Sequence, residues 1–127
     1  MADRMGTFRI DIELENPAQR GPRRRVDGVL VDTGSELSWI PAPVLEALRI
    51  ERVKTKLFRQ ATGAIVERWT GEAQVHVAGT VTPDEVVFGE PNDLIILGSR
   101  TLEGLNVMVD PVGKRLLDSG PALAAAA

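Results

Sequence analysis

The chain has 127 residues, of which 43% are hydrophobic and 26% charged, and its formal net charge at pH 7 is -3. This size and composition predict one globular domain over residues 1–127, with a core at about 7–117 and a flexible tail at 118–127. The net charge gives no indication of a nucleic-acid partner. The chain has no cysteine, which excludes disulfides and a thiol nucleophile.

The chain shows no sign of a membrane or metal partner. No apolar stretch approaches membrane-spanning length, and the first residues lack the apolar segment of a secretory signal. We therefore expect a soluble, cytoplasmic protein. His76 is the only histidine, so neither a metal cluster nor a Ser–His pair can be built from one chain, and no cofactor is expected. His76 itself is predicted to be a surface residue of a strand.

The first part of the chain reads as two antiparallel strands. Apolar and charged residues alternate over 7–14, which predicts a half-buried strand. Residues 15–25 are expected to form a loop, with Arg23, Arg24 and Arg25 exposed to solvent in it. Residues 26–31 form the partner strand and lead into the middle of the molecule.

The second strand ends in an unusual order of residues, Val29-Leu30-Val31-Asp32-Thr33-Gly34-Ser35. Asp32 places an ionisable group at the edge of the core, where an uncompensated charge is costly. Gly34 allows a tight turn, and its N–H can point back at the carboxylate. The pattern therefore predicts an oriented, partly dry carboxylate, although Asp32 and Ser35 are also residue types that cap an ordinary turn or helix.

The middle of the chain predicts a short helix followed by a long hairpin. The helix covers 41–48, because proline is tolerated in a first helical turn and the apolar spacing there is helical. Strands are expected at 51–60 and 65–77, joined by a turn of small residues, Ala61, Thr62, Gly63 and Ala64. Residues 79–83 are expected to turn, 85–88 to form a strand, and 89–93 to turn again.

The last part begins with a second diagnostic stretch, Leu94-Ile95-Ile96-Leu97-Gly98. Glycine at the end of a buried strand indicates a place where another backbone passes too close for a side chain. A helix is expected at 99–105, followed by strands at 107–109 and 114–117 around a turn at 110–113.

Residues 32–35, followed by Leu37, Trp39, Ile40 and Pro41, resemble the catalytic loop of the aspartic proteases. The run 94–98 resembles the hydrophobic-hydrophobic-glycine element of the single-domain, retroviral-type members, the retropepsins. The resemblance implies an all-β, closed acid-protease barrel with one or two short helices. It also implies a strand that crosses beneath the catalytic loop and packs against it, formed by Ile96, Leu97 and Gly98.

The resemblance further implies an aspartic endopeptidase in which Asp32 is catalytic and no metal is needed. Because the motif occurs once, the second carboxylate would come from a second copy, which implies a homodimer. Thr33 would bond across the interface, the Gly34 N–H would hold the carboxylate, and Ser35 would bond to its outer oxygen. An extended peptide would bind beneath a mobile flap formed by Ala61, Thr62, Gly63 and Ala64.

Several alternatives stay open at this stage. The 61–64 turn also fits an ordinary β-hairpin. In pepsins the residue matching Trp39 bonds to a flap tyrosine, but this chain has no tyrosine, so Trp39 is expected to pack. The same fold could bind peptides or partners as a dimer without cutting them. The chain could also be a fragment whose partner loop comes from another polypeptide.

Overall fold

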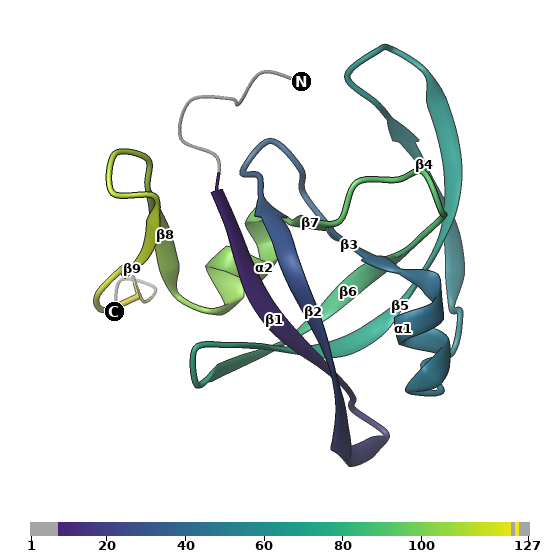
Figure 1. The fold of residues 1–127 in the computed structure, drawn as a ribbon, viewed down its shortest axis with the longest axis horizontal. Helices are drawn as coiled ribbons and strands as arrows, with labels where there is room; N and C mark the ends of the chain where they lie inside the picture. Colours follow the sequence, from purple (N-terminus) through teal and green to yellow (C-terminus); the bar gives the residue numbers. More distant parts are fainter. Residues whose placement is uncertain (1–7, 123, 125–127) are drawn as a thin grey trace.

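A seven-stranded sheet carries most of the chain in the computed structural model, which describes residues 8–122 and 124 (Figure 1). Its strand order is β1-β2-β7-β3-β6-β5-β4, and β1 also pairs with β5. A second sheet consists of β8 and β9 alone. The strands are β1 (Phe8–Asn16), β2 (Gln19–Val31), β3 (Ser38–Pro41), β4 (Lys54–Arg59), β5 (Ile65–Val77), β6 (Thr80–Gly89), β7 (Ile96–Leu97), β8 (Val107–Asp110) and β9 (Arg115–Asp118).

Two short helices, α1 (Ala42–Ala47) and α2 (Ser99–Gly104), complete the described part of the chain. Both helices were predicted from the sequence, and each buries a leucine in the core, Leu45 and Leu102. The mostly β architecture is therefore confirmed. Within residues 8–122 and 124, the structure contains no helix of the length and apolarity that crossing a bilayer requires.

The β1–β2 hairpin is longer than predicted. The expected loop at 15–25 is a turn at Pro17 and Ala18, and β2 already begins at Gln19. The arginines lie in the strand rather than in a loop, because they pair across it: Arg23 bonds to Glu13 at 3.3 Å and Arg25 to Asp11 at 2.7 Å. Exposed opposite charges on paired strands stabilise this extension.

The region 79–83 is also strand rather than turn. The chain reverses at Ala78 and Gly79, which both have positive φ, at 49° and 83°. β6 then pairs with β5 from Thr80↔Val77 to Val87↔Thr70. Two left-handed residues make a tight hairpin turn, so no longer loop is needed here.

The chain ends in the small β8–β9 sheet. The Asp110 carboxylate accepts the Val112 and Gly113 N–H groups, which fixes the predicted turn between these strands. β9 extends to Asp118, and the Ser119 N–H donates to the Asn106 carbonyl at 2.9 Å. Residue 7 of the first predicted strand and residues 123 and 125–127 of the predicted flexible tail lie outside the described residues.

Candidate functional site

Asp32 lies directly after β2, where the strand is bonded to β7. The Leu30 N–H donates to the Ile95 carbonyl and the Asp32 N–H to the Leu97 carbonyl, each at 3.0 Å. The Asp32 residue is only 9% exposed. The strand therefore fixes the backbone of the acidic residue at the edge of the core, as the sequence predicted.

The loop after Asp32 closes back on its carboxylate. The Gly34 N–H donates to Asp32 Oδ1 at 2.9 Å, and the Ser35 N–H donates to the Asp32 carbonyl at 3.1 Å. A Cβ on Gly34 would stand 3.1 Å from Asp32 Oδ1, which is tighter than most real contacts. Glycine thus allows the close N–H donation, while Thr33 is exposed at the crest of the turn.

Ser35 has a hydrogen-bond partner within the loop. Its hydroxyl donates to the Leu37 carbonyl at 2.7 Å. Ser35 therefore supports the shape of the loop, and the expected bond to the outer oxygen of Asp32 stays a prediction.

Gly98 is where two backbones cross. A Cβ there would stand 2.5 Å from the Leu37 carbonyl oxygen and 2.8 Å from that of Ser35. Two backbone bonds directly after Gly98 hold the crossing, from Ser99 N–H to Ser35 O at 2.8 Å and from Arg100 N–H to Glu36 O at 3.0 Å. The strand itself ends at Leu97, and Gly98, directly after it, makes the close approach to the loop.

A chain of buried hydroxyls beneath the loop was not predicted. The Gly98 N–H donates to Ser38 Oγ at 2.9 Å, Ser38 Oγ lies 2.5 Å from Thr101 Oγ1, and the Thr101 hydroxyl donates to Asp84 at 2.5 Å. Because Thr101 spends its proton on Asp84, Ser38 is the donor to Thr101. The only signal in the sequence is a polar residue at an inward position of a strand and of a helix.

A groove of about 660 Å³ lies between the loop that follows Asp32 and the long hairpin of β4 and β5, which we call the arm. The arm extends beyond the rest of the sheet, on the opposite side from β8 and β9 (Figure 1). Asp32, Gly34 and Ser35 line the groove on one side, and Ala61 and Thr62 line it from the turn of the arm. Gly63 and Ala64 are exposed at the same turn but do not line the groove.

An aromatic contact joins the body to the arm. The rings of Trp39 and Phe58 meet edge to face, with centroids 5.0 Å apart, and both residues line the groove. Pairs of this geometry contribute beyond the area they bury. Trp39 therefore packs, as expected in a chain without tyrosine, and its partner is a ring of the arm.

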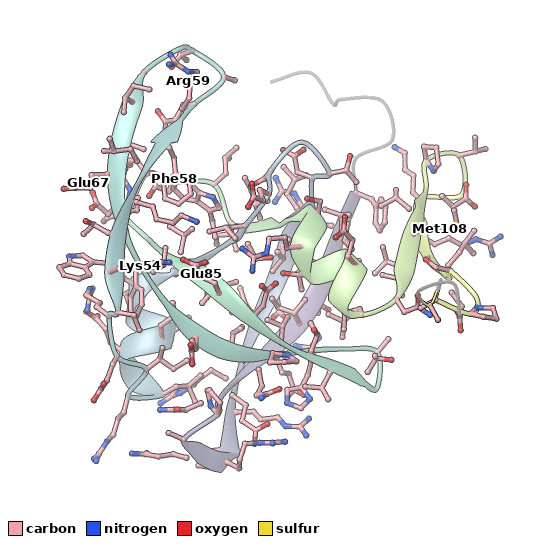
Figure 2. All side chains as sticks on the ribbon, turned by 180° about the vertical axis from the view of Figure 1, so that it is seen from behind. Lys54, Phe58, Arg59, Glu67, Glu85 and Met108 are labelled. Atoms are coloured by element: carbon pink, nitrogen blue, oxygen red, sulfur yellow. The ribbon has the colours of Figure 1, made fainter. Side chains whose placement is uncertain are left out.

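Charged groups also connect the arm to the body. Arg68 on β5 forms a two-pronged pair with Asp93, at 2.8 and 3.0 Å. The bond from Arg68 lowers the pKa of the Asp93 carboxyl, and the same bond raises the pKa of Arg68. Figure 2 shows Lys54 and Glu85 close together below Phe58, and their charged atoms lie 3.9 Å apart.

His76 lies away from the groove and is not a simple surface residue. Its Nε2 lies 2.7 Å from Glu15 Oε1, and the two side chains are 11% and 3% exposed. The Gly21 N–H, then Arg20 and His76, bond to Glu15 and lower the pKa of its carboxyl to about 2. Among residues 8–122 and 124, no three histidine or acidic side chains are grouped as metal ligands.

Comparison with known proteins finds a likeness among solved structures. No family model matches the chain, and no curated protein matches its sequence. The solution structure of the simian foamy virus (mac) protease matches with a TM-score of 0.50 and 19% identity, over 75% of this chain and 91% of that one. At this identity the likeness shows the fold alone. The chain thus has a mostly β fold similar to that of a viral protease.

Proposed function

We propose that this chain is a retropepsin-like aspartic endopeptidase that acts as a homodimer. The observation that carries the proposal is the Asp32 carboxylate, oriented by the Gly34 N–H and lining a groove that the arm borders. The Gly98 crossing beneath the loop and the fold likeness to a viral protease support it. The β1–β5 pairing, which joins the first strand of the order to the last but one, supports the proposed closed barrel.

The proposed chemistry needs two carboxylates around one water molecule. One Asp32 accepts a proton from the water as it attacks the peptide carbonyl, and the Asp32 of the second copy donates a proton to the carbonyl oxygen. Two carboxylates this close share one proton, so the same residue type serves as acid and base. Asp32 occurs once per chain, which is why the proposal requires two copies.

Exposed Thr33 is in a suitable place to bond across the dimer interface, because it lies at the crest of the loop beside Asp32. The substrate would be an extended peptide that lies in the groove and adds its backbone as a strand. Trp39, Phe58 and Ile96 provide apolar surface for its side chains. Ala61 and Thr62 would close over it from the arm.

Replacing Asp32 by asparagine tests the proposal. We expect Asp32→Asn to abolish cleavage of an unstructured protein between pH 3 and pH 7, while the fold and the dimer remain. Asp27→Asn is the matched control, because Asp27 is exposed and pairs with Arg25 on the surface. An active Asp32→Asn variant would contradict the assignment of Asp32.

Mixing wild-type and Asp32→Asn chains tests the dimer. After random exchange at equal amounts, about one quarter of the dimers carry two acids, so activity per wild-type chain should fall by about half. If the activity per wild-type chain is the same before and after mixing, each copy works alone. If a dimeric wild type binds peptides but cuts none, the fold serves as a binding module instead.

A further inference from the structure

Among the ion pairs that the structure shows between residues 54–69 of the arm and the body, the pair of Arg68 and Asp93 is the shortest. The guanidinium donates Nε–H to Oδ2 at 2.8 Å and Nη2–H to Oδ1 at 3.0 Å. The side chains are 14% and 8% exposed. Two parallel bonds from a planar group fix direction as well as distance, and burial removes the screening that weakens surface pairs.

Asp93 is itself held firmly. Its Oδ2 also accepts the Glu90 N–H at 2.7 Å, and its own N–H donates to the Glu90 carbonyl at 2.9 Å. The chain then runs through Leu94 into β7, where Leu97 accepts the Asp32 N–H. Arg68 is therefore attached to the same backbone segment that holds the catalytic loop.

Arg68 also lies where the arm leaves the sheet. Pairing of β5 with β6 ends at Thr70↔Val87, whereas pairing of β5 with β4 continues to Ile65↔Arg59. Beyond Thr70 the two arm strands are paired only with each other in the sheet. A contact this close to the base of a two-stranded arm sets the direction of the arm, because a small change of angle there moves the turn by a larger distance.

The other ion pairs between residues 54–69 of the arm and the body are longer than the Arg68–Asp93 pair. Lys54 and Lys56 approach Glu85 at 3.9 and 3.8 Å, and Glu90 reaches Arg68 at 3.7 Å from a side chain that is 61% exposed. The Trp39–Phe58 ring contact lies further along the arm. This ring contact forms only when the arm lies against the body, and it includes no hydrogen bond that would hold the arm in that position.

We propose that Arg68 and Asp93 are positioning residues, which hold the arm against the body and so set how wide the groove above Asp32 opens. The consequence for substrate entry rests on the proposed function. The position of the arm does not depend on the proposed function, so the arm contact and the protease activity can be tested separately. Loss of either partner leaves the other charge largely buried without its main bond, and the arm relieves that cost by lifting into water.

Trp39 is a built-in reporter of arm position. The chain has two tryptophans, and Trp69 is 45% exposed, so Trp69→Phe leaves Trp39 as the single emitter. In this background we expect Asp93→Asn and Arg68→Gln to raise the acrylamide quenching constant of Trp39 roughly twofold, because lifting the arm removes Phe58 from the indole. Far-ultraviolet circular dichroism verifies that each variant is folded.

Glu67→Gln is the matched control. Glu67 is next to Arg68 but projects from the outer side of the arm, away from the groove (Figure 2). Glu67→Gln removes one negative charge, as Asp93→Asn does, and should leave the quenching of Trp39 unchanged. If Asp93→Asn fails to fold, Arg68→Lys replaces it, since lysine keeps the charge but loses the two-pronged geometry and should raise quenching less. Quenching equal to that of the control in the folded variants would overturn the proposal.

Kinetics separate this inference from the proposed function. If the chain cleaves peptides, Asp93→Asn should raise KM several-fold while kcat changes by less than about twofold, because the loosened arm weakens substrate binding without altering Asp32. Increased quenching in a chain that cleaves nothing would support the arm assignment and contradict the protease. Unchanged quenching in an active protease would do the reverse.

Discussion

Gly98→Ala tests the backbone crossing that supports the loop after Asp32. The added methyl group would stand 2.5 Å from the Leu37 carbonyl oxygen, about 0.9 Å short of the 3.4 Å at which ordinary contact begins. The Leu37 carbonyl carbon and the Ser35 carbonyl oxygen would be at 2.7 and 2.8 Å. All three atoms belong to backbone that is held by hydrogen bonds, so none can move as a flexible side chain would.

The expected cost is at the upper end of what overpacking produces. We expect Gly98→Ala to lower the free energy of unfolding by about 3 kcal/mol. For a urea slope of about 2 kcal/mol per molar, the unfolding midpoint falls by about 1.5 M. Urea titrations followed by circular dichroism at one fixed protein concentration measure this, since association would add to the apparent stability.

Gly63→Ala is the matched control. Gly63 has a φ of 90° but no atom within 4 Å of an added Cβ, so alanine there has only a conformational cost, of about 1–2 kcal/mol. A Gly98→Ala midpoint equal to or above that of Gly63→Ala would refute the crossing argument. It would mean that the loop and β7 can separate at little cost.

Three further changes have defined outcomes. Ser38→Ala leaves the buried Gly98 N–H without its acceptor and should cost about 1–3 kcal/mol in urea unfolding; no loss would mean that the N–H has another acceptor. Because the pKa of Glu15 is lowered from 4.5 to about 2, its contribution to stability is present above pH 4.5 and lost as the pH falls toward 2. In Glu15→Gln the fall over that range should therefore be shallower, and an unchanged slope in thermal melts would contradict the assignment. Phe58→Leu removes the ring contact with Trp39, worth about 0.5–1.5 kcal/mol, and should raise its quenching constant as the loss of the arm contact does; unchanged quenching would show that the indole does not sense the arm.

The sequence predicted best where local chemistry and packing agree. The short apolar run ending in Asp32 and Gly34 predicted that the glycine N–H points back at the carboxylate, and the two meet at 2.9 Å. Gly98 was predictable for a similar reason, because a buried strand that ends in glycine leaves room for another backbone. The helix after Pro41 followed from its spacing and its proline.

The missed features depend on partners distant in the sequence. The Arg23–Arg25 run looked like a loop because its stabilising acids lie across the hairpin on β1. His76 looked exposed because Glu15, its partner, is 61 residues away. Neither the residue type nor the alternation of a strand indicates which distant charge will face a given side chain. These pairs can therefore be identified only in the folded chain.

The shortest strand in the structure has a consequence for assembly. β7 pairs in parallel with β2 through Leu30↔Ile96 and antiparallel with β3 through Trp39↔Ile96, so the two strands that flank the acidic loop are fastened to one residue. The entropy of ordering that loop is therefore lost when a single chain folds. In the proposed homodimer, each copy would bring an already oriented acid to the interface, and the free energy of association would not have to organise it.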